Sequence, residues 1–332
     1  MKILVIGLGS IGQRHLQNLK IIYPNAKFYA LRLKNKNIVI KNVKILNRIN
    51  LSKYYKIKII SSYKKAQLLK PNLVFICNPS IFHLRDANFF SKLGSNIFIE
   101  KPLSGEQRQQ KNLIKILKKK RRQAMIGFQL RFHPAIKFVK NLIKNNKYGN
   151  VIRGNFDDLS YLPKFHPYED YSKSYAARKE LGGGVLSTLI HEVDLIAYFF
   201  DLPKKTYSLK YNSKILRSNV DDNVFCLMQY KKNKSDFFIS LNLSFTSPKP
   251  KRGFEILFKK YSLKCDLLKN KIEIYSNQNN KIIYKKKYKL NRNKLFLDEI
   301  KYMKDCIKKN KNNFLSVQNT ISTNQLYNMI NK

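Results

Sequence analysis

The stretch Lys2-Ile3-Leu4-Val5-Ile6-Gly7-Leu8-Gly9-Ser10-Ile11-Gly12 decides the fold of this chain. A short apolar run leads directly into a turn with the glycine spacing GxGxxG, and an amphipathic segment follows. A strand that ends in this turn and opens a helix is typical of dinucleotide-binding domains, where Gly7 allows the tight turn, Gly9 lets a pyrophosphate approach, and Gly12 permits close helix packing. We therefore predict a dinucleotide site at the helix N-terminus, against the alternative of a glycine turn without a ligand. Its residues are Gly7, Gly9, Ser10, Ile11 and Gly12.

The end of the second predicted strand bears on which dinucleotide is bound. An acidic residue is usual there in NAD-binding domains, because its carboxylate accepts hydrogen bonds from the ribose 2′-hydroxyl. This chain carries Ala30-Leu31-Arg32-Leu33-Lys34 instead. Arg32, with Lys34 beyond it, could clamp a 2′-phosphate. The residues therefore favour NADP(H) over NAD(H), and the alternative is that Arg32 is a solvated cation.

The remaining pattern predicts two domains. Short apolar strands alternate with amphipathic helices up to about residue 125, which predicts a Rossmann domain over residues 1–125 with a doubly wound parallel sheet. Longer strands rich in Tyr, Phe and Ile follow, which predicts an α+β domain over residues 126–332 with a largely antiparallel open sheet. Its last helices are expected to pack back on the first domain. The predicted strands include Lys2–Ile6, Lys27–Leu33, Leu73–Cys77, Asn96–Ile99, Ala124–Phe128, Val224–Tyr230 and Phe237–Leu243, and the last helices are Leu295–Ile307 and Val317–Asn331.

The composition could suggest a nucleic-acid-binding protein, because the formal net charge is +46. Lysines outnumber arginines about four to one and are spread over the whole chain, which favours solvated surface charge. We expect no specific nucleic-acid partner. Four scattered cysteines indicate neither a disulfide framework nor a metal site. The apolar runs are too short for a leader or a membrane span, so we expect a soluble, cytoplasmic protein.

Several further motifs occur in a fixed order along the chain. Glu100-Lys101-Pro102 follows the strand Asn96–Ile99, and Cys77-Asn78-Pro79 with His83 follows the strand before it. Two longer motifs are Gly127-Phe128-Gln129-Leu130-Arg131-Phe132-His133-Pro134 and the run from Gly182-Gly183-Gly184 to His191-Glu192-Val193-Asp194. Together they resemble the glucose-fructose oxidoreductase, inositol dehydrogenase and rhizopine catabolism (Gfo/Idh/MocA) family of dehydrogenases over essentially the whole chain.

The resemblance implies a role for individual residues. Lys101 would hold the reacting oxygen between nicotinamide and substrate, and His191 would carry the proton. The family places an aspartate where Thr188 stands, so this chain lacks the charge that would orient His191. Asp194 could touch the site, although a carboxylate at that place is more often structural. The implied cofactor contacts are Asn78, Pro79, His83, Glu100 and Lys101, and the implied substrate contacts are Arg131, Tyr161, His166, Tyr175, Arg178, Thr188 and His191.

A narrower likeness lies between Tyr161 and Leu181, which resembles the branch associated with surface-polysaccharide sugar biosynthesis. It implies reversible hydride transfer to or from a sugar, sugar acid or nucleotide sugar, without a metal. A homodimer or tetramer formed through the C-terminal sheet is expected. The missing aspartate leaves a second hypothesis, in which the protein is a cofactor-binding regulator or pseudoenzyme. A third hypothesis, nucleic-acid binding, predicts strongly salt-dependent affinity but has no recognised motif behind it.

Overall fold

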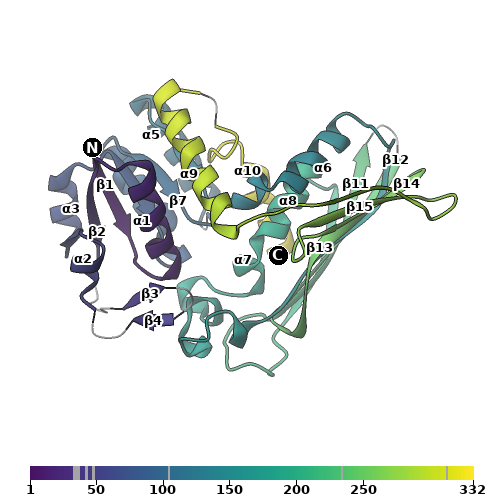
Figure 1. The fold of residues 1–332 in the computed structure, drawn as a ribbon, viewed down its shortest axis with the longest axis horizontal. Helices are drawn as coiled ribbons and strands as arrows, with labels where there is room; N and C mark the ends of the chain where they lie inside the picture. The colour runs from purple at the N-terminus through teal and green to yellow at the C-terminus, as the bar shows by residue number, and fades with distance from the viewer. Residues whose placement is uncertain (33–37, 42–43, 47–48, 104, 233–234, 312) are drawn as a thin grey trace.

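Two β-sheets, one from each half of the chain, organise the molecule (Figure 1). The computed structural model describes residues 1–32, 38–41, 44–46, 49–103, 105–232, 235–311 and 313–332. Within those residues no single helix has the length and apolar character to cross a bilayer. The segments Lys179–Thr188 and Ile190–Phe200, which are bent by 52° relative to each other, reach that length and apolar character only when they are taken together.

The first sheet has six strands in the order β5-β2-β1-β6-β7-β8, and each strand runs parallel to its neighbours. Its central strands are buried, in keeping with a parallel sheet covered on both faces. The predicted Rossmann sheet is therefore confirmed. The strands are β1 (Lys2–Ile6), β2 (Lys27–Leu31), β5 (Lys58–Ile60), β6 (Leu73–Ile76), β7 (Asn96–Ile99) and β8 (Ala124–Ile126); the helices are α1 (Ser10–Ile22), α2 (Leu51–Tyr54), α3 (Tyr63–Leu69), α4 (His83–Lys92) and α5 (Gln107–Lys120); a small hairpin pairs β3 (Val39–Lys41) with β4 (Lys44–Leu46).

The strand order reverses between β1 and β6. The chain proceeds from β1 outward through β2 and β5, and then returns to place β6, β7 and β8 on the other side. In such sheets the crevice outside the carboxyl ends of the two strands at the reversal receives the ligand. Here the glycine turn follows β1 and Asn78 lies just after β6, so the fold brings these two segments to that crevice.

The second sheet has eight strands in the order β10-β11-β12-β9-β13-β14-β15-β16. β9 and β12 run parallel, and the other neighbouring strands run antiparallel, which confirms the predicted largely antiparallel sheet. Helices α6 and α8 lie against one face, with α10 beside α8 (Figure 1). The strands are β9 (Val151–Tyr161), β10 (Lys205–Tyr211), β11 (Asn223–Lys232), β12 (Ser235–Ser244), β13 (Thr246–Phe258), β14 (Tyr261–Asp266), β15 (Lys271–Ser276) and β16 (Ile282–Lys287); the helices are α6 (Pro134–Lys144), α7 (Val185–Thr188), α8 (Ile190–Phe200), α9 (Arg292–Lys309) and α10 (Ile321–Asn331).

The other face of this sheet is apolar over β10 and β11. On β10 the burial alternates, and Tyr207, Leu209 and Tyr211 all point outward. Phe225 pairs in register with Leu209 and is also exposed, so the apolar surface continues onto β11. An exposed apolar sheet face of this extent is typical of a surface that another protein covers.

Element ends differ from the sequence-based expectations where backbone turns intervene. β2 ends at Leu31, while Leu33 and Lys34 lie outside the described residues. The last helix begins at Ile321 and not at Val317, because the Thr320 hydroxyl and backbone N–H both donate to the Ser316 carbonyl and close a separate turn. Apolar periodicity cannot distinguish such a turn from the first turn of a helix.

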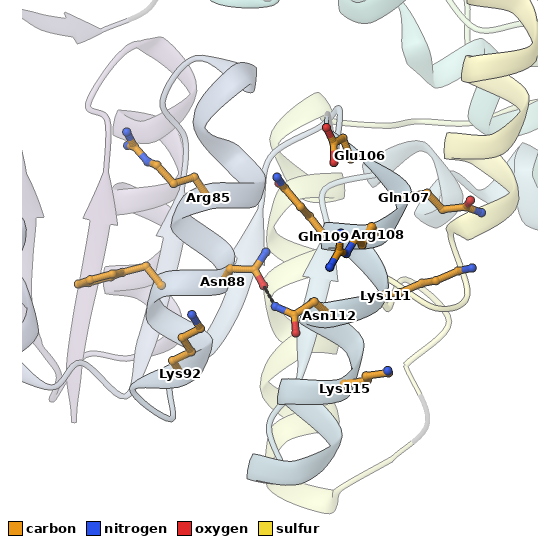
Figure 2. A pocket seen from close by; sticks show the side chains of 11 residues that line it. Arg85, Asn88, Lys92, Glu106, Gln107, Arg108, Gln109, Lys111, Asn112 and Lys115 are labelled. Atoms are coloured by element: carbon orange, nitrogen blue, oxygen red, sulfur yellow. Dashed lines mark hydrogen bonds between the residues drawn. The ribbon is translucent and has the colours of Figure 1, made fainter.

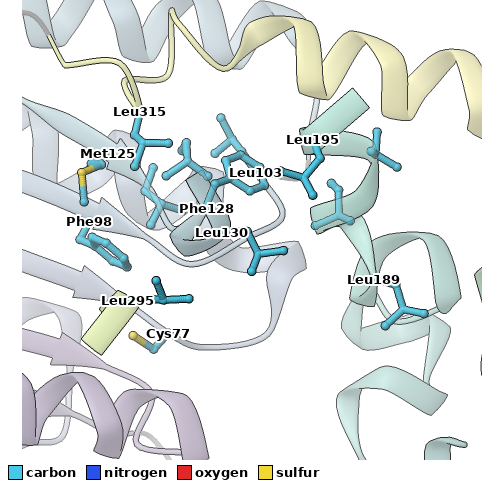
Figure 3. Packing of buried hydrophobic residues seen from close by; sticks show 14 of the residues in the cluster. Cys77, Phe98, Leu103, Met125, Phe128, Leu130, Leu189, Leu195, Leu295 and Leu315 are labelled. Carbon is cyan, nitrogen blue, oxygen red and sulfur yellow. The ribbon is translucent and has the colours of Figure 1, made fainter. Parts of the chain in front are cut away.

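A shared apolar cluster joins the two halves. Figure 3 shows Phe98 and Met125 of the first sheet near Phe128, with Leu295 of α9 and Leu315 of the C-terminal segment packed on them. Helix α9 also lies along α1, as expected for a C-terminal segment that packs back. Asn18 and Asn293 exchange side-chain hydrogen bonds of 3.1 and 2.9 Å across this contact.

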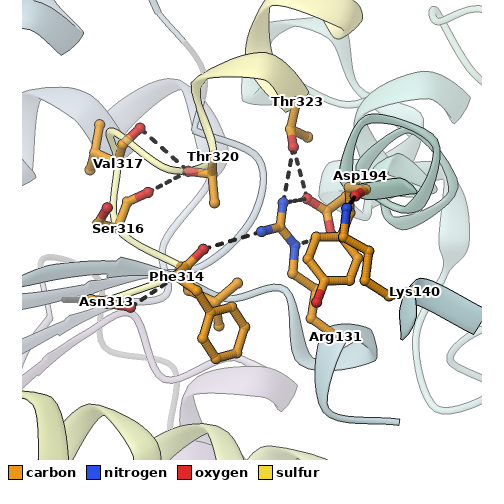
Figure 4. Close-up of polar contacts among 11 residues, drawn as sticks. Arg131, Lys140, Asp194, Asn313, Phe314, Ser316, Val317, Thr320 and Thr323 are labelled. Carbon is orange, nitrogen blue, oxygen red and sulfur yellow. Dashed lines mark hydrogen bonds and ion pairs between the residues drawn. The ribbon is translucent and has the colours of Figure 1, made fainter. Parts of the chain in front are cut away.

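A buried ion pair between Arg131 and Asp194 connects segments that are far apart in the sequence (Figure 4). Arg131 donates to both carboxylate oxygens of Asp194 on α8, at 3.0 and 2.6 Å, and to the Phe314 carbonyl at 3.2 Å. Thr323 of α10 donates to the same carboxylate at 2.8 Å. Both charged side chains are almost fully buried. Arg131 was expected to contact substrate, but its donors are used inside the protein, so we assign it a structural role.

Arg131→Met should lower the free energy of unfolding by about 3–5 kcal/mol, because it leaves Asp194 buried without its counter-charge. The double variant Arg131→Met/Asp194→Leu should recover most of that loss, since neither charge then remains inside. Urea unfolding at pH 7 measures both effects. An equal loss in the single and double variants would contradict this role for the pair.

Candidate functional site

The glycine turn has the geometry that a dinucleotide needs. Gly7 has a φ of +84°, and a Cβ on Gly12 would lie 2.0 Å from the Gly7 carbonyl oxygen, so neither position accommodates a side chain. A Cβ on Gly9, by contrast, would meet nothing within 4 Å. Gly9 caps α1, which begins at Ser10 and presents its backbone N–H groups to that open space. These residues fit a dinucleotide whose pyrophosphate lies at the helix N-terminus.

His83 connects two loops beside this turn through its side chain. Its ring nitrogens lie 2.8 Å from the Pro102 carbonyl oxygen and 2.7 Å from the Asn78 carbonyl oxygen. Burial lowers the pKa of His83, and the two carbonyl groups oppose that shift. The side chain is 1% exposed, so it positions the loop that carries Asn78 and Pro79 and is not itself available to a ligand.

Glu100 is also a positioning residue. One carboxylate oxygen lies 2.5 Å from His15 Nε2, and the other accepts the Lys101 backbone N–H at 3.3 Å. Burial raises the pKa of Glu100, but its hydrogen bond to His15 and the nearby charges of His15 and Lys101 outweigh burial and lower it. His15 was not singled out from the sequence. The available signal was its spacing, three residues after Gly12 and therefore on the face of α1 that meets the sheet.

Lys101 and His191 are brought together at the mouth of the crevice. The Lys101 ammonium donates to the Thr188 carbonyl oxygen at 2.5 Å. His191 Nε2 lies 3.1 Å from Gln129 Nε2, so the Gln129 side-chain amide occupies that ring nitrogen. His191 Nδ1 and Thr188 Oγ1 are buried and have no hydrogen-bond partner within the described chain. Two polar atoms without partners beside an ammonium group are what a hydroxyl-bearing ligand would satisfy.

His191 is neutral in this environment. Burial lowers its pKa well below 6.5, and the positive charges of Lys101, Arg252 and Arg292 lower it further. A neutral imidazole can accept a proton from a substrate hydroxyl. The nearest acid along the helix, Glu192, is itself occupied by Arg252, which donates to it at 2.8 Å.

Thr188 takes part in the site through its backbone. Its hydroxyl cannot supply the charge of the aspartate that the family resemblance places there. Its carbonyl oxygen nevertheless accepts a hydrogen bond from the Lys101 ammonium, so the position still holds the lysine.

Glu192 is the carboxylate that follows His191 in the chain. Burial raises the pKa of Glu192 to about 7, but its side chain faces Arg252, which also pairs with Asp158 at 3.1 Å.

The expected substrate-binding stretch bridges the two domains. Ser80 donates to the Gly182 carbonyl at 3.1 Å, which docks the loop on the first domain. His166 Nδ1 lies 3.0 Å from the Tyr168 hydroxyl. Tyr168 is also hydrogen-bonded to Ser10. Burial raises the pKa of Tyr168, and the hydrogen bond to Ser10 offsets part of that rise. Tyr168 is therefore a neighbour of the dinucleotide turn that the sequence did not reveal.

The other expected substrate contacts are distributed differently. Tyr161 ends β9 and Tyr175 begins a short 3₁₀ turn, and both are partly buried along the same loop. Arg178 is exposed and lies 3.7 Å from Glu180, so it is not gathered with Lys101 and His191. Arg32 lies directly after β2, where its backbone N–H donates to the Ile60 carbonyl. Burial lowers the pKa of its guanidinium.

A separate groove of about 1050 Å³ lies between α4 and α5 (Figure 2). The groove contains none of the predicted site residues. It is basic because it is lined by Arg85, Lys92, Arg108, Lys111 and Lys115.

The four cysteines are buried and unpaired. Within the described residues, no three His, Cys, Asp or Glu side chains are grouped so that they could hold a metal ion.

Comparison with known proteins matches both halves of the chain. Residues 1–128 match the oxidoreductase family with an NAD-binding Rossmann fold, and residues 136–264 match the GFO/IDH/MocA C-terminal domain. Myo-inositol 2-dehydrogenase of Thermotoga maritima is 27% identical over 201 residues, which are 60% of this chain and 54% of that protein. The chain spans about half the length of the curated relatives it matches.

Two solved structures illustrate the shared fold. Levoglucosan dehydrogenase, in complex with NADH and levoglucosan, has a TM-score of 0.81 at 14% identity and covers 99% of this chain and 96% of its own. UDP-N-acetylglucosamine 3-dehydrogenase GnnA from Acidithiobacillus ferrooxidans has a TM-score of 0.75 at 17% identity, with coverages of 100% and 96%. At these identities the likeness shows the fold alone.

The lowered pKa of His191 predicts a pH-dependent contribution to stability. Below about pH 6.5 the unfolded chain protonates this residue and the folded chain does not, so the free energy of unfolding falls as the pH drops through that value. The slope for this residue approaches ~1.4 kcal/mol per pH unit. Urea unfolding of wild type and His191→Gln between pH 8 and pH 5 measures it, because His83, His133 and His166 are common to both proteins. Parallel curves for the two proteins would show that His191 is not desolvated.

Proposed function

The chain belongs to the Gfo/Idh/MocA family of oxidoreductases, and from that premise we propose that it is an NAD(P)-dependent dehydrogenase or reductase that acts on CH–OH groups. It transfers a hydride between nicotinamide and a carbinol or keto carbon of a sugar, sugar acid or nucleotide sugar. The observation that carries the proposal is that Lys101 reaches the segment of Thr188 and His191, where two buried polar atoms have no hydrogen-bond partner among the described residues.

Lys101 and His191 have different roles at the reacting oxygen. The bound nicotinamide would donate or accept the hydride at its C4 carbon. An ammonium group has three donors, and Lys101 uses one of them on the Thr188 carbonyl, so others remain to hold the substrate oxygen and stabilise its developing negative charge. During oxidation, neutral His191 accepts the hydroxyl proton at Nδ1, with its ring proton on Nε2 and the Gln129 amide turned so that its oxygen accepts from Nε2–H. During reduction the proton returns along the same route.

The substrate contacts follow from the surrounding loop. We assign hydroxyl recognition to the Thr188 hydroxyl, Tyr161, His166 and Tyr175, which lie at the cleft or along its covering loop. Asn78 and Pro79 lie where the nicotinamide half of the cofactor would reach. The likeness to the surface-glycan branch supports a sugar-type substrate.

The assembly and its location are also proposals. The first domain spans residues 1–125 and the second spans 126–332, and the outer face of the second sheet pairs with another copy to give a dimer or a dimer of dimers. The apolar residues Tyr207, Leu209 and Phe225 on that face support this pairing, which sedimentation velocity tests. A cytoplasmic location fits the buried, unpaired cysteines, which are typical of a reducing compartment.

One observation supports a second candidate function, a cofactor-binding regulator of the same fold. Thr188 supplies no carboxylate beside His191, and Glu192 is held by Arg252. Tight cofactor binding without turnover on any keto-sugar would favour the regulator. Turnover that depends on Lys101 would favour the enzyme.

Lys101→Met should lower kcat/KM by at least about 10²-fold, because it removes the group that stabilises charge on the reacting oxygen. Cofactor affinity should change by less than about tenfold, since the glycine turn is intact. The measurement is the absorbance change of NADPH and NADH with a panel of keto-sugars, and Lys92→Met on α4 serves as the matched control. Undiminished turnover in Lys101→Met would exclude the proposed role.

Arg32→Ala tests the preference for NADP(H). The Kd for NADPH should rise by about tenfold or more, because a charge-assisted hydrogen bond to the 2′-phosphate is lost, whereas the Kd for NADH should stay nearly constant. Fluorescence titration of both cofactors measures the change. Tighter binding of NADH than of NADPH by the wild type would overturn the preference and leave the dehydrogenase proposal standing.

A further inference from the structure

Arg14 and Arg292 form no ion pair with a carboxylate of the part of the chain that the structure describes. Within the described residues, the arginines that form ion pairs with carboxylates are Arg85, Arg131, Arg178, Arg217 and Arg252. Arg14 and Arg292 are not among them. Burial lowers the pKa of Arg14, and the negative charge of Glu100 opposes that shift, but the Glu100 oxygens are hydrogen-bonded to His15 and to the Lys101 backbone. Neither guanidinium group therefore forms an ion pair with a carboxylate of the described residues.

Packing between α1 and α9 brings these two arginines to the same place. Arg14 lies two residues beyond Gly12 on α1, and its guanidinium carbon is 4.9 Å from the centre of the Phe296 ring on α9. Arg292 is the first residue of α9 and lies about one helical turn before Phe296, on the same side of that helix. The N-terminus of this 18-residue helix adds positive potential at the same point.

The charges of the two arginines act on each other and on the catalytic pair. Desolvation lowers the pKa of Arg292, and repulsion by Arg14 and Arg252 lowers it further. The positive charge of Arg292 reaches His191, whose pKa it also lowers. Across the cleft, burial lowers the pKa of His166, and both Arg292 and Arg14 add to that effect. The charge of Arg292 thus acts on both His191 and His166, and the charge of Arg14 acts on His166.

His191, on which the charge of Arg292 acts, carries one of two buried polar atoms without a hydrogen-bond partner in the described residues, namely His191 Nδ1 and Thr188 Oγ1. Hydroxyl groups of a ligand would satisfy the hydrogen bonding of these two atoms, and an oxyanion would pair with the guanidinium groups. A neutral sugar would satisfy the first set and leave the two arginines repelling each other. A ligand that carries both hydroxyl groups and a negative charge would satisfy both.

We propose that Arg14 and Arg292 bind an anionic group of the substrate, so that the sugar accepted by this site carries a carboxylate or a phosphate. This inference rests on the proposed function and narrows its substrate class. Guanidinium groups recognise planar carboxylates and phosphate oxygens through paired hydrogen bonds, and partial removal from water strengthens that contact. Arg14 and Arg292 are binding residues in this scheme and take no part in hydride transfer.

Titration of the NADH-loaded protein with matched sugars tests the proposal without requiring turnover. Glucose is the neutral member, glucuronate carries the carboxylate, and glucose 6-phosphate and UDP-glucose carry phosphate, all at equal ionic strength. At least one oxyanion should bind about tenfold or more tightly than glucose. Arg14→Gln and Arg292→Gln should each remove most of that advantage. Arg108→Gln, which deletes an exposed arginine on α5, should retain it.

Each other result has a definite meaning. Equal binding of glucose and all three oxyanions, or binding of none of them, overturns the inference. A rise in the Kd for NADH in the two variants, with sugar preference unchanged, shows that the arginines serve the cofactor and also overturns it. Because Arg292 is the first residue of its helix, Arg292→Gln keeps the test valid even if Arg14→Gln fails to fold. Oxyanion binding with no turnover on any sugar contradicts the proposed enzyme and leaves the anion site intact.

Discussion

The buried contact between His15 and Glu100 is the constraint on which the site depends. It joins α1, which begins in the glycine turn, to the loop after β7, so the segment that would hold the dinucleotide and the residue that would act on the substrate cannot move independently. The second oxygen of Glu100 then holds the Lys101 backbone. Because both side chains are removed from water, breaking the contact would leave a charged group without compensation, which gives the arrangement its rigidity.

Positive charge is the second general property of the site. Burial lowers the pKa of His191 and keeps its ring neutral, and the charges of Lys101, Arg252 and Arg292 add to that effect. Thr188, three residues earlier, supplies no carboxylate that would offset these charges. A negative group on a bound substrate would reduce the same excess of charge. The electrostatics that favour an anionic substrate and those that set the protonation of His191 therefore have a common origin.

Much of the first domain could be predicted from local pattern. β1 and β7 have the bounds that the apolar runs indicate, and the motif around Lys101 falls directly after β7, where a short strand must turn. The same reasoning assigned Arg131 to the substrate because it lies in a recognisable motif. In the folded protein Asp194, which is 63 residues away, takes up that guanidinium, and no local feature of the sequence shows the pairing.

The sequence by itself determined the class of fold, the place of the glycine turn and the positions of Lys101 and His191, because these depend on glycine spacing, on apolar periodicity and on motifs that are contiguous in the chain. Only the tertiary structure decided that His15 holds Glu100, that the Thr188 carbonyl holds Lys101, and that the charges of Arg14 and Arg292 act on each other. These contacts join residues tens to hundreds of positions apart. Their partners are chosen by how helices pack on sheets, and such packing is a property of the folded chain that short-range pattern does not encode.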